Sequence, residues 1–221
     1  MPADGIAAWQ ESSRTAEAWS ARRERIAAFY GGLLERHFGG LRACDWGTRQ
    51  TQEIRFEILA QVLPLRGKRV LDVGCGLADF ADYLAARHGR LTYEGVDIAP
   101  PMIEEARRRH PGLSLRVLDI LREDPGGPYD LVTANGIFYL LGEDPEPHMQ
   151  RLIARMWQLT RSAVAFTSLS TWGSRCDPGE FYADPLATAD FCRTLTPWVV
   201  LRHDYLPHDF AIYMYREPRR P

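Results

Sequence analysis

The segment VLDVGCGLAD, residues 70–79, holds the pattern that decides the fold. Its first four residues are typical of a buried strand, and two glycines follow before a helical pattern begins. Gly74 and Gly76 allow the backbone to turn sharply and allow a ligand to approach it closely. The helix that follows points its free N–H groups at the same place. The segment therefore predicts a strand, a ligand-binding turn and a helix.

Short apolar runs alternate with helical patterns from Lys68 onward. The runs predict strands over residues 69–73, 91–97, 113–118, 129–134, 163–168, 198–205 and 209–215. Helices are predicted over residues 78–87, 101–110, 147–160 and 185–195. Repeated strand–helix–strand units favour an α/β fold, a parallel sheet with helices on both faces. Only residues 206–208 join the last two strands, too few for a crossover, so the last of seven strands is expected to be antiparallel.

Residues 1–66 carry helical patterns and no convincing strand. One helix is predicted around residues 26–37, where two glycines stop it, and another over residues 51–63. Each has a single apolar stripe that must pack on another surface. We therefore predict a helical lid or extension over residues 1–66 and a sheet domain over residues 67–221. The same helices would also suit a homodimer contact, and both roles stay open.

Acidic residues stand at the ends of the first three predicted strands. Asp72 precedes the glycine loop, Asp97 ends the second strand, and Asp119 follows the third. Ligands of open α/β sheets bind beyond the carboxyl ends of the strands, so these three carboxylates are expected to line one site. Asp97 follows Gly74 by 23 residues, close to the spacing at which an acidic side chain accepts hydrogen bonds from ribose hydroxyls.

A dinucleotide-binding loop is the rival interpretation of the two glycines. Its pattern is G-x-G-x-x-G/A, and here the third position is Asp79. A carboxylate there would face the pyrophosphate, and Asp72 also suits a cationic ligand better than a diphosphate. A nicotinamide-dependent oxidoreductase is therefore disfavoured, although it stays an alternative.

Four segments together resemble the motifs of class I S-adenosylmethionine-dependent methyltransferases. They are, in the order of the family's motifs, VLDVGCGLADF (70–80), YEGVDIAPPMIEEAR (93–107), VLDILRED (117–124) and YDLVTANGIFYLL (129–141). In one departure, Ala78 stands where a third glycine is common. The resemblance implies a Rossmann-like seven-stranded sheet, mostly parallel with the last strand antiparallel, and S-adenosylmethionine as the cofactor.

The resemblance also implies a role for each matching residue. Asp72 would contact the methionyl amino group, directly or through water, while Gly74 and Gly76 lie against the methionyl and ribose parts. Asp97 would bind the ribose hydroxyls, and Asp119 would accept from the adenine amino group. The remaining implied contacts are the backbone N–H of Ile120 to the adenine ring, Ile98 and Met102 beside the ring, and Asn135 near the methionyl group.

The catalytic group is not fixed by the motifs. A sulfonium methyl group is already activated, so alignment of donor and acceptor supplies most of the acceleration. A general base helps where the acceptor must lose a proton. His208, in the turn before the last strand, is the best-placed base, unless it is only a surface histidine. Tyr139 is a second catalytic candidate, and the substrate candidates are Arg55, Phe138, Trp172 and Tyr182.

Composition narrows the class of partner. The net charge of −2 disfavours nucleic acid, and the motif N/D-P-P-Y/F/W is absent after the fourth strand, which disfavours methylation of bases or glutamine. No apolar run is long enough to span a membrane, and the first ten residues do not resemble a signal peptide. Four cysteines without C-x-x-C spacing predict reduced thiols in the cytoplasm and no metal site.

We therefore expect a cytoplasmic methyltransferase that acts on a small molecule. One alternative keeps the cofactor and changes the reaction to another displacement at the sulfonium, such as cyclisation of the methionyl part, which would release methylthioadenosine. The other alternative is a non-catalytic binding protein. The identity of the acceptor and the oligomeric state are not determined by the sequence.

Overall fold

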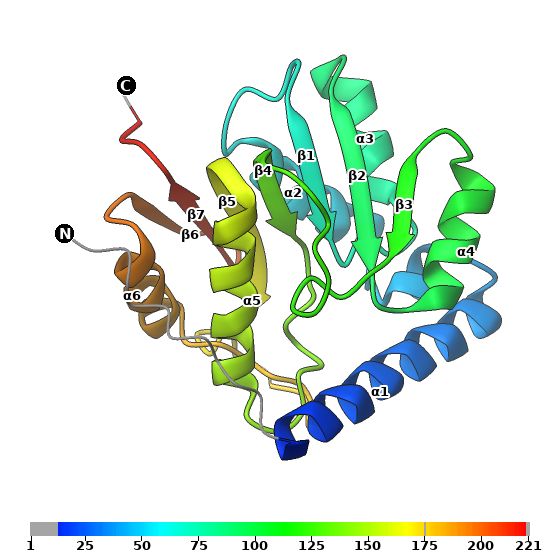
Figure 1. Ribbon diagram of the computed structural model, residues 1–221. Helices are drawn as coiled ribbons and strands as arrows, with labels where there is room; N and C mark the ends of the chain where they lie inside the picture. The colour runs from blue at the N-terminus through cyan, green and yellow to red at the C-terminus, as the bar shows by residue number, and fades with distance from the viewer. Residues whose placement is uncertain (1–12, 175, 220–221) are drawn as a thin grey trace.

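The computed structural model describes residues 13–174 and 176–219, and its centre is a seven-stranded sheet in the order β3-β2-β1-β4-β5-β7-β6 (Figure 1). The strands are β1 (Arg69–Val73), β2 (Thr92–Asp97), β3 (Ser114–Val117), β4 (Tyr129–Ala134), β5 (Thr160–Leu169), β6 (Val199–Leu206) and β7 (Asp209–Tyr215). β7 pairs antiparallel with both β5 and β6, and the pairs from β3 to β5 are parallel. The predicted mostly parallel sheet with an antiparallel last strand is confirmed.

Helices cover both faces of this sheet. They are α1 (Ser13–His37), the 3₁₀ turn η1 (Leu41–Cys44), α2 (Arg49–Ala60), α3 (Asp79–His88), α4 (Pro100–Arg109), α5 (Pro145–Leu159) and α6 (Pro185–Leu195). Figure 1 shows α5 in front of the sheet and α2 and α3 behind it. Among the described residues, none of the helices is both long and apolar enough to cross a membrane.

Two apolar layers sandwich the sheet, and neighbouring residues of one strand belong to different layers. Val70 packs with Phe56 of α2 and Phe80 of α3, while the next residue, Leu71, packs with Ile153 of α5. Side chains alternate between the two faces of a strand, so a strand buried on both sides is apolar almost throughout. This explains why the segment before the glycine loop has so few polar residues.

The N-terminal helix α1 crosses below the carboxyl ends of the strands in Figure 1. It packs against η1 and α4, and it ends where Phe38 and Gly39 adopt left-handed backbone angles, with φ of 49° and 75°. Thr48 then caps α2 by accepting a hydrogen bond from the backbone N–H of Thr51 at 3.1 Å. α1, η1 and the start of α2 therefore lie over the edge where a ligand is expected.

Candidate active site

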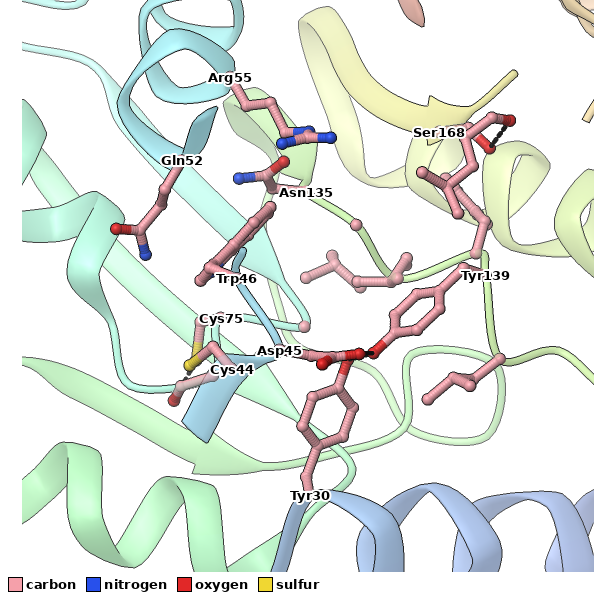
Figure 2. Close-up of a pocket in the computed structure, with 18 of the residues that line it drawn as sticks. Tyr30, Cys44, Asp45, Trp46, Gln52, Arg55, Cys75, Asn135, Tyr139 and Ser168 are labelled. Carbon is pink, nitrogen blue, oxygen red and sulfur yellow. Dashed lines mark hydrogen bonds between the residues drawn. The ribbon is translucent and has the colours of Figure 1, made fainter. Parts of the chain in front are cut away.

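A cavity of about 630 Å³ opens beyond the carboxyl ends of the strands. Its walls come from the ends of β1 to β5, from α1, from the η1–α2 connection, from the segment before α6 and from the β6–β7 turn. This volume lies within the range of small-molecule sites. Figure 2 shows part of the cavity, with Trp46 near its centre.

The glycine loop forms one wall and needs both of its glycines. Gly74 and Gly76 adopt φ of +72° and +53°, in the left-handed region. A Cβ atom at Gly74 would lie only 2.3 Å from Cγ2 of Ile137, so the loop after β4 closes directly on this residue. Ala78 also has a positive φ, 63°, a conformation that glycine adopts more readily than alanine.

Asp72 is buried at the end of β1 and lines the cavity. The hydroxyl of Tyr93 donates a hydrogen bond to its Oδ2 at 2.6 Å. Burial raises the pKa of Asp72 to about 7, although the Tyr93 hydrogen bond opposes this shift. A cation placed against Asp72 would favour its ionised form.

Asp97 connects the end of β2 to the glycine loop. Its two oxygens accept hydrogen bonds from the backbone N–H of Gly76 at 3.0 Å and of Ala99 at 2.9 Å. Desolvation raises the pKa of Asp97, and these N–H groups oppose the shift. The carboxylate is therefore fixed in orientation at the cavity wall.

The remaining predicted cofactor residues also meet at this cavity. Asp119 is buried after β3, where its Oδ1 accepts from the backbone N–H of Leu121 at 2.9 Å. Met102 is buried beside the glycine loop, 3.5 Å from where a Cβ at Gly76 would stand. Ile98 and Ile120 line the same end.

Asn135 follows β4 and is oriented by Thr167. The hydroxyl of Thr167 donates to Asn135 Oδ1 at 2.8 Å and accepts from the backbone N–H of Gly136 at 3.2 Å. The Nδ2 atom of Asn135 is buried and has no hydrogen-bond partner among the described residues. A buried donor without a partner is costly, so a ligand acceptor atom is expected beside it. Phe138, fully buried, lines the cavity and packs edge-on against Phe166.

Two tyrosines and an aspartate join α1 and the end of η1 to the loop after β4 (Figure 2). Tyr139 donates to Oδ2 of Asp45 at 2.9 Å, and the hydroxyls of Tyr139 and Tyr30 are 3.0 Å apart. Burial is the main cause that raises the pKa of both phenols. Both therefore stay protonated at neutral pH, which makes Tyr139 a hydrogen-bond donor rather than a base.

Arg55 and His208 meet at the opposite end of the cavity. Nη2 of Arg55 is 3.4 Å from Nε2 of His208, and Nε of Arg55 donates to Asp209 Oδ2 at 2.9 Å. His208 is half-buried and lines the cavity rather than standing on the open surface. Its position suits the predicted base, whose role stays a prediction.

The structure separates the two other predicted substrate residues. Tyr182 lines the cavity, and its hydroxyl donates to Glu180 Oε2 at 2.6 Å. Trp172 is 51% exposed and is not among the lining residues described. Its ring instead packs on His203 of β6, with centroids 4.9 Å apart. In the turn after β5, the backbone N–H of Trp172 donates to Ser170 Oγ at 3.1 Å.

Sequence reasoning missed the η1–α2 connection. Asp45 and Trp46 line the cavity from this irregular segment, and Gln52 of α2 donates to Asp79 Oδ2 at 2.9 Å. Trp46 lies between Arg55, whose Cζ is 5.2 Å from the ring centroid, and Gly136. This connection is irregular and has no periodic pattern, so no signal in the sequence pointed to Asp45 or Trp46.

Comparisons with known proteins agree with this geometry. Residues 71–162 match a family model described as a methyltransferase domain. A putative methyltransferase of Mycobacterium tuberculosis is 32% identical over 149 residues, which cover 64% of this chain and 89% of that protein. The chain therefore belongs to the methyltransferase family, and the family that the four motifs predicted is confirmed.

Other relatives differ in length or in sequence. Trans-aconitate 2-methyltransferase of Methylobacterium nodulans is 35% identical over 100 residues, 45% of this chain and 37% of that protein. The chain spans about a third to a half of the enzymes of this name that it matches. Magnesium protoporphyrin IX methyltransferase of Synechocystis, solved with bound S-adenosylmethionine, has the same fold: its TM-score is 0.66 at 13% identity, over 89% of this chain and 97% of that one.

Proposed function

We propose that this protein transfers the methyl group of S-adenosylmethionine to a small-molecule acceptor and releases S-adenosylhomocysteine. The observation that carries the proposal is the continuity of one cavity, which begins at the strand-end carboxylates and extends past β4 to Arg55 and His208. A cofactor that filled the β1–β3 end would leave the other end for the acceptor.

The residues at the β1–β3 end fit this cofactor. We assign the methionyl ammonium to Asp72, the ribose hydroxyls to Asp97 and the adenine amino group to Asp119. The unpartnered Nδ2 of Asn135 and the glycine loop support this assignment, because they offer a buried donor and a close backbone approach. When bound, the cofactor supplies an electrophilic methyl group on its sulfonium.

The chain's own contribution is alignment and exclusion of water. We propose that α1, η1 and the connection that follows η1 act as a lid. It closes the cavity through Tyr30 and Asp45, which reach Tyr139 across it. Alignment of two bound reactants supplies much of the rate in such displacements. His208 is the side chain that we propose as base for an acceptor that must lose a proton.

The acceptor is proposed to be a small molecule because the lid and the segment before α6 wall the cavity. The trans-aconitate enzymes match this chain over only about a third of their length, so their substrate is not assigned to it. We propose a cytoplasmic location, which the free thiols of Cys44, Cys75 and Cys192 support.

Thermal unfolding with S-adenosylmethionine, S-adenosylhomocysteine and NAD tests the proposal. A ligand at a hundredfold excess over its dissociation constant stabilises the native state by about 2.7 kcal/mol. We expect a clear rise in Tm with both adenosyl compounds and none with NAD. A rise with NAD alone would overturn the proposal. Release of methylthioadenosine instead of S-adenosylhomocysteine, seen by chromatography, would favour the other displacement.

A further inference from the structure

Arg55 stands out among the side chains around the cavity. Of the described residues that line it, Arg55 is the only arginine or lysine. Its side chain is only 7% exposed. A buried guanidinium must be paired and hydrogen-bonded. The partners of Arg55 therefore show which of its N–H groups remain for a ligand.

The partners of Arg55 fix its orientation and leave donors over. Nε donates to Asp209 of β7, Nη1 donates to the carbonyl of Thr51 at 3.2 Å, and Nη2 lies 3.4 Å from His208. Tyr205 donates to the other oxygen of Asp209, which holds that carboxylate in place. A guanidinium has five N–H groups, so about two, on Nη1 and Nη2, remain for a ligand.

The sheet topology places Arg55 at the acceptor end. Its partner Asp209 begins β7 and pairs with Leu169 at the end of β5, whereas Asp72 and Asp97 end β1 and β2. Both β4 and β5 lie between β1 and β7. With about 4.8 Å between neighbouring strands, the Arg55–Asp209 pair lies beyond the carboxylates that we assign to the cofactor.

We propose that Arg55 binds a carboxylate of the methyl acceptor and that the acceptor carries only one such group; this inference rests on the proposed function. The N–H groups that remain on Nη1 and Nη2 are charged donors, and a guanidinium is the group best suited to bind a carboxylate through such donors. Asp209 balances the buried charge of Arg55 before the acceptor arrives.

The other charged side chains of the cavity limit the acceptor to one carboxylate. Asp45 and Glu180 also line the cavity, and no further arginine or lysine among the described lining residues offsets them. A second or third carboxylate would face these groups and be repelled in a partly desolvated site. A tricarboxylate such as trans-aconitate is therefore expected to bind poorly.

Calorimetric titration of the protein saturated with S-adenosylhomocysteine tests this directly. The probes are benzoate, cinnamate and octanoate, each beside its uncharged amide, and trans-aconitate. We expect at least one acid to bind at millimolar concentration or below, its amide at least tenfold more weakly, and trans-aconitate more weakly than that acid. The proposal is wrong if none of the three acids binds, if the amides bind as well, or if trans-aconitate binds best.

Variants then assign the effect to Arg55. Arg55→Gln would leave Asp209 buried and unpaired, so it is combined with Asp209→Asn. We expect acid binding to weaken about tenfold to a hundredfold, the worth of charge-assisted hydrogen bonds, while affinity for S-adenosylhomocysteine stays within about twofold. Arg55→Lys keeps the charge, loses the planar fork and should show a smaller loss.

Arg161→Gln is the matched control, because Arg161 makes a two-bond pair with Asp130 and is not among the described lining residues. It should leave acid binding unchanged. Unchanged acid binding in the Arg55→Gln, Asp209→Asn protein would overturn the assignment. So would weakened binding of S-adenosylhomocysteine with unchanged binding of methylthioadenosine, since Arg55 would then hold the methionyl carboxylate. If wild-type protein fails to bind S-adenosylhomocysteine, it is the proposed function that fails.

Discussion

The ends of three consecutive strands, β1, β2 and β3, supply the polar groups at one end of the cavity, whereas segments far apart in the sequence build the acceptor end. Asp72 and Asp97 lie in the last two residues of β1 and β2, and Asp119 follows β3 by two residues. Arg55 and Asp209 meet across 154 positions of sequence. The cofactor end is thus built by local structure, and the acceptor end by tertiary contacts.

The largest effect is expected from Asp97→Ala at the cofactor end. Loss of two charge-assisted hydrogen bonds to the ribose should weaken binding of S-adenosylhomocysteine by about a hundredfold or more. Calorimetry measures the affinity, and the melting curve checks that the fold survives, because Asp97 also holds the backbone of Gly76. Asp124→Ala, an exposed carboxylate, is the control. Unchanged affinity would remove Asp97 from the ribose site.

A comparison of Gly74→Ala with Gly67→Ala separates the steric clash in the glycine loop from the strain of a positive φ. Gly67 has nearly the same φ, +74°, and no atom lies within 4 Å of the place that a Cβ would take there, whereas Gly74 meets Ile137. Both alanine variants should lose about 1 kcal/mol from strained backbone, and Gly74→Ala about 2 kcal/mol more from overpacking. Urea unfolding measures both values. Equal losses would mean that Ile137 moves aside freely.

The pH dependence of cofactor binding tests Asp72. Its raised pKa of about 7 means that it loses its proton as the pH rises through 7, and only the ionised form attracts an ammonium group. Affinity for S-adenosylhomocysteine should therefore increase about tenfold from pH 6 to pH 8. Methylthioadenosine, which lacks the ammonium, should show no such change. A flat profile for both compounds would place the ammonium elsewhere.

The smallest effect concerns the tyrosine pair that joins the lid to the loop after β4. Tyr30→Phe and Tyr139→Phe each remove one hydroxyl, and a double-mutant cycle isolates their coupling. We expect a coupling energy of about 1 kcal/mol in urea unfolding, since one neutral hydrogen bond is at stake. Strictly additive losses would show that the two hydroxyls do not depend on each other.

The difference between the two ends of the cavity also explains which site residues could be predicted from the sequence. The glycine loop and the strand-end acids were predictable because a strand fixes which end of the sheet its last residue reaches. Asp45 and Trp46 were not, since an irregular connection carries no periodic signal. Trp172 was expected in the cavity from its place after β5, but its ring packs on His203 of β6, a tertiary contact that the order of elements does not reveal.

The position of β7 between β5 and β6 has a consequence for the order of assembly. β6 pairs with β7 and not with β5, so it has no neighbour in the sheet until residues 209–215 have been synthesised and inserted. That same strand brings Asp209 to Arg55. Residues 69–135 can pair their strands early, while the acceptor end must wait for a contact of long sequence separation, a slow event in folding. A growing chain would thus gain its cofactor-binding edge before it gains the means to select an acceptor.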